Sequence, residues 1–182
     1  MRTLLLGAAL LFSFQALAAT SKDCDELKVW RTRLALFASN LQNMNTTRTP
    51  EGGPYKPLVV KSCSNGGCFL DDPPPPAMRY LPDHPDADHE GYVAFPNMDP
   101  KIEYATFVIA AKVLRQLAEN HTCGTRMVND GEMDAIEYPS TPDEPREDRF
   151  TFDKTGNVVS WAEVSSQGKM TAIGLTADGK IK

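Results

Sequence analysis

Regularly spaced apolar residues in two stretches limit the folds open to this chain more than any other feature. Between Asp23 and about Asn45 the apolar positions lie three or four residues apart, a heptad pattern on one helix face. They are Leu27, Trp30, Leu34, Phe37, Leu41 and Met44. A second helix is expected from Asp99-Pro100, since Asp caps a helix start and Pro suits its first turn, to about Gly124. Its expected apolar face is Ile102, Ala105, Ile109, Val113 and Leu117.

Cysteines at the ends of these helices predict how the helices pack. Each helix would run for roughly 22 residues, or about 33 Å. Cys24 lies at the start of the first and Cys123 at the end of the second. Antiparallel packing brings these ends together, so we expect an antiparallel pair of long helices joined by a Cys24–Cys123 disulfide.

An N-terminal apolar segment predicts the compartment. Arg2 precedes the run from Leu4 to Phe14, and Ala16-Leu17-Ala18 closes it, which is the pattern of a secretory signal peptide over residues 1–18. Cleavage is expected after Ala18, with Ala19 as the near alternative; an uncleaved anchor is the competing interpretation. The run is too short to cross a bilayer of about 30 Å, so no membrane span is expected after cleavage.

The chain has 4 cysteines, an even number that can all form disulfides, as expected for export to an oxidising compartment. Four cysteines allow three pairings. Cys63 and Cys68 flank a flexible turn of Ser, Asn and two Gly, so we expect them to pair with each other. That leaves Cys24 for Cys123, the pair that the helices favour.

The rest of the chain predicts short strands and irregular segments. Residues 46–98 contain candidate strands at 55–61, 78–81 and 91–95, and Pro73 to Pro76 exclude a helix there. Residues 124–148 are expected to be a linker, acidic and proline-rich from Tyr138 onward. A small β-meander is expected over 149–182, with strands at 150–152, 158–164 and 170–175 and one more after Asp178-Gly179. The fold class is therefore α+β, with a helical hairpin over residues 19–123 that encloses a loop and β region.

Two blocks of residues resemble a known family. The first runs from Phe37 to Tyr55; the second comprises 71–74, 80–93 and 95–99. Both resemble the rod and hook proteins of the bacterial flagellum, and Thr47 to Tyr55 resembles the proximal rod proteins in particular. The motif residues are Asn40, Asn43, Thr46, Thr47, Gly52, Gly53, Pro54, Tyr55, His84, Pro85, Asp86, Gly91, Tyr92, Pro96 and Asn97.

The resemblance implies a structural, non-enzymatic role without a cofactor, in an axial subunit whose helices pack against neighbours in the basal body. Three features depart from the family: the signal segment, the roughly 60 residues after the second helix, and a second helix without the family's usual stretch. A Cys24–Cys123 bond would also fix the helix pair before assembly. These departures favour an alternative, a disulfide-stabilised envelope adaptor that reuses the rod fold outside the rod axis.

Metal and catalytic interpretations are weaker. Cys63, Cys68, His84 and His89 have zinc-finger spacing, but the prolines exclude the helix that a finger needs, so we expect a disulfide and no metal. The acidic stretch Asp83 to Glu90 lacks the glutamate and flanking helices of an EF-hand and is expected to be a solvated turn, with weak calcium binding left open. No serine has the setting of a catalytic nucleophile, so we expect no enzyme.

Charge and helix pattern define the expected partners. The net charge of -5 disfavours nucleic acid. Expected partners are other rod or basal-body proteins, or periplasmic envelope proteins, and the heptad pattern also allows self-association. The leading hypothesis is a periplasmic structural protein at the flagellar basal body.

Overall fold

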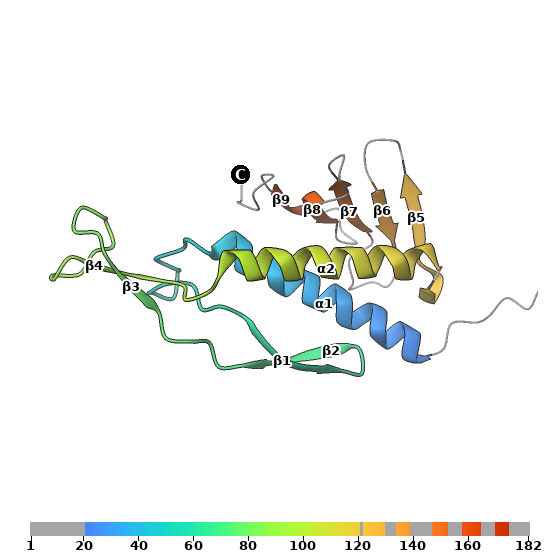
Figure 1. Ribbon diagram of the computed structural model, residues 1–182, viewed down its shortest axis with the longest axis horizontal. Helices are drawn as coiled ribbons and strands as arrows, with labels where there is room; N and C mark the ends of the chain where they lie inside the picture. The colour runs from blue at the N-terminus through green and yellow to red at the C-terminus, as the bar shows by residue number, and fades with distance from the viewer. Residues whose placement is uncertain are drawn as a thin grey trace, which may run out of the picture.

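The computed structural model describes residues 21–120, 122–129, 134–138, 147–152, 158–164 and 170–174. The expected signal peptide and the strand expected after Asp178-Gly179 lie outside the described residues. Two long helices, α1 (Ser21–Asn43) and α2 (Pro100–Glu119), form the body of the molecule (Figure 1). A short 3₁₀ turn, η1 (Thr122–Gly124), follows α2. Among the residues that the structure describes, neither long helix combines the length and the hydrophobicity of a membrane span.

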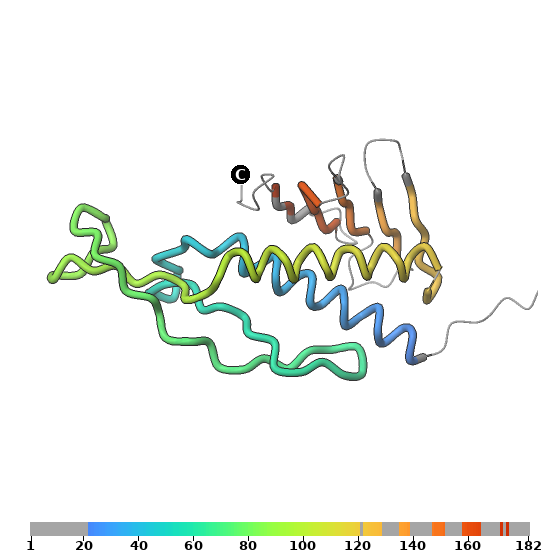
Figure 2. Tube along the Cα trace, viewed as in Figure 1, coloured from blue at the N-terminus to red at the C-terminus, as the bar shows by residue number. Residues whose placement is uncertain are grey.

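The helices run in opposite directions along each other (Figure 2). At one end, Cys24 of α1 is disulfide-bonded to Cys123 of η1, with the Cα atoms 5.4 Å apart. At the other end, the Asn40 side chain of α1 donates a 3.1 Å hydrogen bond to Glu103 in the first turn of α2. The start of α2 is capped by Asp99, whose carboxylate accepts from the Lys101 N–H at 2.9 Å.

The helix face that packs in α2 differs from the expected one. Ile102 and Ile109 are 61% and 53% exposed, so Ile109 is not a packing residue of this fold. Val113 and Leu117 are half-buried, and Leu117 packs against the core. The buried residues of α2 are Phe107, Ala110, Ala111, Leu114 and Ala118. Because α2 is apolar on both sides, spacing alone does not identify the inward side.

On α1 the heptad positions lie at the core. Leu27, Leu34 and Leu41 are buried, with Ala38 beside them. Trp30 and Phe37 are half-buried and pack against the same cluster.

Five antiparallel strands form a sheet in the order β5-β6-β7-β8-β9. The strands are β5 (Arg126–Asn129), β6 (Asp134–Glu137), β7 (Glu147–Phe152), β8 (Val158–Val164) and β9 (Met170–Gly174). The sheet lies along one side of the helix pair (Figure 1). Its buried Ile136, Phe150, Val158 and Trp161 belong to the same core as the helices. Hydrogen bonds from Tyr104 Oη of α2 to the Val158 carbonyl at 3.3 Å, and from Gln42 Nε2 of α1 to the Ala172 carbonyl at 3.4 Å, also join the layers.

This sheet corrects the expected linker at 124–148. Strands β5 and β6 lie within that range, Tyr138 is buried, and β7 begins at Glu147. The two misassigned strands are four residues each, too short for a clear alternating pattern. Strand β5 is held in the sheet by pairing with β6, and β6 is held by pairing with β5 and β7.

Two β-hairpins follow α1. The first pairs β1 (Val59–Ser64) with β2 (Gly67–Asp71), and the Cys63–Cys68 disulfide joins its strands, with the Cα atoms 4.0 Å apart. This hairpin lies on the side of α1 away from the sheet (Figure 1), where the Arg33 Nε donates to Cys63 Sγ at 3.3 Å. The second pairs β3 (Ala77–Tyr80) with β4 (Tyr92–Phe95) and extends beyond the helix pair.

Candidate functional site

Asn40 is the centre of a buried polar network where α1 ends. Its side chain is 1% exposed. The amide nitrogen donates to the Leu58 carbonyl at 3.0 Å and to Glu103 at 3.1 Å, while the amide oxygen accepts from the Leu58 N–H at 2.8 Å and the Tyr55 hydroxyl at 3.0 Å. One amide therefore ties helix α1, helix α2 and the chain that enters β1 to one another, and it leaves no buried polar atom of its own without a partner.

The segment after α1 is folded back by the other Asn and Thr residues of the first block. Asn43 Nδ2 donates to the Ser39 carbonyl at 2.9 Å, and Thr46 Oγ1 donates to Asn43 Oδ1 at 3.2 Å. The Tyr55 N–H then donates to the Thr46 carbonyl at 3.0 Å, and the Tyr55 hydroxyl lies 3.0 Å from Ser39 Oγ. The end of the helix is thus capped by side chains that also start the loop.

Between Thr46 and Tyr55 the chain turns through Gly52 and Gly53. Their φ angles are +92° and +73°, in the left-handed region that favours glycine. The Thr49 N–H donates to the Gly53 carbonyl at 2.8 Å, and the Gly52 N–H donates to the Thr49 carbonyl at 3.0 Å. Pro54 follows, half-buried, and leads into the Tyr55 contact.

Asp86 joins the second block to the first. Its carboxylate accepts from the Thr47 hydroxyl at 2.7 Å and from Arg48 Nε at 2.5 Å. The Asp86 N–H donates to His84 Nδ1 at 3.0 Å, and the His84 ring meets the ring of Phe95 edge-on, with centroids 6.2 Å apart. The structure therefore brings the two sequence blocks into a single unit.

The remaining residues of the second block shape the β3–β4 hairpin and its exit. Gly91 has φ +86°, and a Cβ there would lie 2.8 Å from the Tyr80 ring, so only glycine fits. The Tyr92 ring packs edge-on against Tyr80 with centroids 5.3 Å apart. Pro96 is buried, Pro85 is exposed, and Asn97 Nδ2 donates to the Pro75 carbonyl at 3.0 Å.

Hydrogen bonds and burial set the charges of this site. Donation from Thr47 and from Arg48 lowers the pKa of Asp86, so its carboxylate stays ionised. Backbone donation, chiefly from the Tyr92 N–H, lowers the pKa of Asp88. Burial raises the pKa of Glu103 and of Tyr55, so the tyrosine acts here as a neutral hydroxyl donor.

The loop carboxylates are used by the chain itself. Asp88 Oδ1 accepts from the Glu90 and Tyr92 N–H groups at 2.9 and 2.8 Å, and Asp86 is held by Thr47 and Arg48. Cys63 and Cys68 are joined to each other, apart from His84. Within the described residues, no group of three His, Cys, Asp or Glu side chains is arranged to hold a metal ion.

Sequence reasoning missed two parts of this arrangement. Glu103 was not among the expected site residues, although an acidic residue in the first helical turn is a common signal. A second polar cluster, around Asp148 and Arg31, lies between α1 and the sheet. Asp148 falls in the range 124–148 that was expected to be a linker. Local sequence gives no signal for it, since its members come together only when the sheet packs on α1.

No family model matches the chain, but individual curated proteins do. The chain is 28% identical over 114 residues to the flagellar basal-body rod protein FlgC of Borreliella burgdorferi, covering 47% of this chain and 75% of that protein. It is 32% identical over 91 residues to FlgC of Yersinia enterocolitica, covering 44% and 68%. For FlgC of Buchnera aphidicola the identity is 30% over 94 residues, with the same coverage of 44% and 68%.

These matches span most of each relative and less than half of this chain. The resemblance that the two motif blocks indicated is therefore confirmed by these matches. The chain belongs to the family of flagellar basal-body rod proteins FlgC, as a diverged member.

Proposed function

We propose that this chain is a periplasmic, non-enzymatic structural protein of the bacterial flagellar basal body that contributes to flagellum assembly or motility. The observation that carries the proposal is the contact of Asp86 with Thr47 and Arg48. Through it, the two motif blocks form one braced unit at the end of the helix pair opposite the Cys24–Cys123 disulfide. A rigid, self-braced loop unit suits a subunit that must present a fixed surface to its neighbours.

The compartment is supported by the disulfides. All four cysteines are paired, as Cys24–Cys123 and Cys63–Cys68. Such bonds persist in oxidising compartments such as the periplasm and are rare in the cytosol. The signal-like segment over residues 1–18 supports the same route of export.

The structural role is supported by how the site's polar groups are used. The Tyr55 hydroxyl, the Asn40 amide and the Asp86 carboxylate all bind other groups of the chain. Groups that are engaged in this way stabilise a loop and are not poised to attack a substrate. The relatives are likewise named as rod proteins.

Complementation tests the role. A strain that lacks this chain is expected to lose swimming motility in soft agar. A wild-type copy of the gene is expected to restore that motility. Asp86→Ala removes the contact between the two blocks and is expected to restore less motility than the control Asp83→Ala, which changes an exposed neighbour. The two variants are compared at equal protein level in the periplasm. Full motility without the chain would overturn the proposal.

A second candidate is an envelope adaptor that reuses the rod fold outside the rod axis. The observation in its favour is the sheet, whose Phe150 and Trp161 fill the core against Phe107 of α2, with the rings of Phe107 and Trp161 6.1 Å apart. One side of the helix pair is therefore covered by the chain itself. The Cys24–Cys123 bond also holds the pair closed without a partner.

Site-specific crosslinking separates the two candidates. A photo-reactive residue at Ile109, on the uncovered face of α2, is expected to crosslink to basal-body proteins if the chain is a rod component. Crosslinks only to other envelope proteins would favour the adaptor. The same probe at exposed Lys56, outside the helix pair, is the control. Deleting residues 138–182 is less suitable, since it removes Phe150 and Trp161 from the core.

A further inference from the structure

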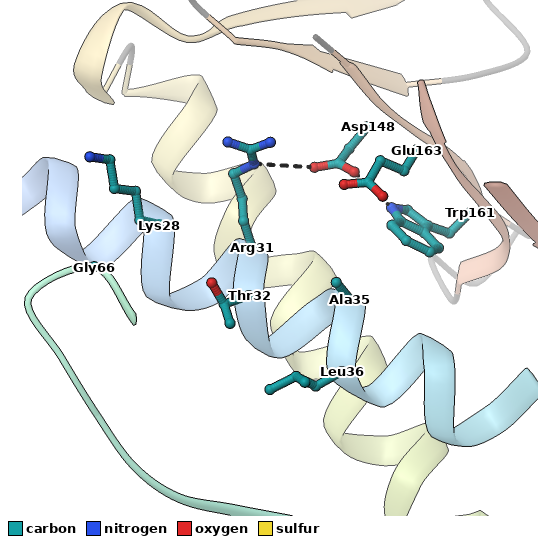
Figure 3. A pocket seen from close by; sticks show the side chains of 9 residues that line it. All are labelled: Lys28, Arg31, Thr32, Ala35, Leu36, Gly66, Asp148, Trp161 and Glu163. Atoms are coloured by element: carbon teal, nitrogen blue, oxygen red, sulfur yellow. Dashed lines mark hydrogen bonds and ion pairs between the residues drawn. The ribbon is translucent and has the colours of Figure 1, made fainter. Parts of the chain in front are cut away.

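A cavity of about 380 Å³ lies beside α1, between the sheet and the turn of the β1–β2 hairpin (Figure 3). Thr32, Ala35 and Leu36 of α1 form one wall, and Gly66 of the hairpin turn borders it. Trp161 and Glu163 of β8 form the opposite wall. The motif blocks of the rod family contribute none of these residues, so the cavity is separate from the site described above.

The deep end of the cavity holds a buried carboxylate whose charge is already balanced. Asp148 is 2% exposed and accepts from the Tyr138 hydroxyl at 2.5 Å and from Trp161 Nε1 at 3.0 Å. Arg31 Nε lies 3.9 Å from Asp148 Oδ2, the oxygen that also accepts from Tyr138, and the Arg31 guanidinium stacks 3.8 Å above the Tyr138 ring. Arg31 therefore contacts both Asp148 and Tyr138, and its charge also acts on Glu163.

Glu163 is a second carboxylate at the cavity, and no described side chain forms an ion pair with it. Figure 3 shows it beside Asp148, with its oxygens toward the cavity and close to the Trp161 indole. Within the described part of the chain it has no hydrogen bond or ion pair, although it is half-buried. Burial and the neighbouring Asp148 charge raise its pKa, and the Arg31 charge opposes this only in part. An unpartnered, half-buried carboxylate at a cavity wall is costly to the fold unless a cation binds there.

We propose that this cavity binds a primary alkylammonium group, with Glu163 as its counter-ion. The flanking surfaces fit the rest of such a ligand. Ala35 and Leu36 offer an apolar wall for an aliphatic stem, and Thr32 lines the cavity with them on α1 (Figure 3).

Lysine 28 does not oppose this assignment. Lys28 is exposed at the mouth of the cavity, and in Figure 3 its amine extends away from Glu163. It would instead face a carbonyl or carboxylate on the outer part of a ligand. The net charge of -5 also favours cationic partners at longer range. A primary alkylammonium group can come from two sources, a lysine side chain of a partner protein or a free amine. The proposal holds whether or not the chain is part of the rod.

Titration of the intact protein followed by the two tryptophan indole N–H signals in ¹⁵N NMR tests the proposal. Two probes are used at pH 8, n-butylammonium and lysine blocked at both its main-chain ends. Each is expected to move the Trp161 signal saturably and to leave that of Trp30, which lies outside the cavity, in place. Glu163→Gln, which keeps shape and removes charge, is expected to weaken binding at least tenfold. Glu90→Gln, an equal charge change on the exposed far hairpin, is expected to bind like wild type.

Blocked lysine that binds as well as n-butylammonium would support a protein lysine as the source, and binding of n-butylammonium alone would support a free amine. The proposal is wrong if no probe moves Trp161 saturably, or if butyrate moves it equally. It is also wrong if folded Glu163→Gln, with its native indole signals intact, keeps affinity within twofold of wild type.

Discussion

The Thr47 hydroxyl donates a 2.7 Å hydrogen bond to the Asp86 carboxylate across 39 positions of sequence. The two residues belong to different loops, one that leaves α1 and one at the tip of the second hairpin. Arg48, next in sequence, binds the other oxygen of the same carboxylate. A single acidic side chain thus holds both family motif blocks in one position, and its loss is expected to separate them.

Asp86→Asn is expected to loosen both loops and leave the helices intact. Amide hydrogen exchange should quicken at Thr49 and Tyr55, whose N–H groups are bonded inside the first loop, while the core of α2 stays protected. Donation from Thr47 and Arg48 lowers the pKa of Asp86, so its contribution is present above the usual value of about 3.9 and is lost as pH falls through the lowered pKa. The difference from wild type should therefore vanish in acid.

Asp83→Asn is the matched control, because Asp83 is exposed and close to Asp86 in the same loop. Unchanged exchange at Thr49 and Tyr55 in Asp86→Asn at neutral pH would show that the contact does not hold the loops together.

Asn40→Ala is expected to destabilise the whole fold. It removes an amide that is 1% exposed and leaves the Leu58 N–H and the Tyr55 hydroxyl without their acceptor. The expected cost is about 2–4 kcal/mol in the free energy of unfolding measured by urea denaturation. Asn45→Ala, at an exposed position just beyond α1, should cost less than about 0.5 kcal/mol. Equal effects of the two variants would contradict the assigned role of Asn40.

A pair of substitutions in α2 tests which of its faces is packed. Phe107 is fully buried and contacts Trp161, so Phe107→Ala should cost about 3–5 kcal/mol. Ile109 is 53% exposed, so Ile109→Ala should change the free energy of unfolding by less than about 0.5 kcal/mol. If Ile109→Ala instead cost more than Phe107→Ala in thermal or chemical unfolding, the packed face of α2 would be the one expected from spacing alone.

Asp148 is expected to make stability depend on pH in the direction opposite to Asp86. Burial is the main cause that raises its pKa, so between about pH 3.9 and that raised pKa the folded state binds the proton more tightly than the unfolded state. The contribution of Asp148 to stability therefore falls as pH rises through this window. The free energy of unfolding of wild type, relative to that of Asp148→Asn, should fall as pH rises through this window. Above the raised pKa the difference should stay constant.

Exposed Asp72→Asn is the control for Asp148, and should not show this slope. Unfolding measured at several pH values decides the matter. A wild type that gains stability with rising pH relative to Asp148→Asn would mean that Arg31, Tyr138 and Trp161 stabilise the ion more than burial disfavours it.

Local sequence patterns predict where the helices lie, but they do not determine which face of α2 is buried. The heptad positions on α1 and the Asp99-Pro100 cap of α2 arise from interactions within a few residues, and such interactions can be read from spacing. The face of α2 depends instead on what packs against it. Both Phe107 and Ile109 are large and apolar, and only the position of the sheet determines which one is buried.

The sheet shows the same limit more strongly. Strand β8 has the range expected from sequence, 158–164, because a mostly apolar run lies there between two turn signals, at 155–157 and 167–168. Strands β5 and β6 escape local reasoning, since four residues beside an acidic, proline-rich stretch carry no clear period. The motif residues were identified by family resemblance, whereas the Asp86 bridge and the Asp148 cluster depend on contacts between distant segments.

Quantitative mass spectrometry of purified basal bodies, compared with the soluble periplasm, tests the proposed role most directly. We expect this chain to be enriched with the rod proteins, in a fixed ratio to them, and we expect Asp86→Ala to lower that ratio. Recovery of the chain only in the soluble periplasmic fraction would contradict a basal-body role and favour the adaptor.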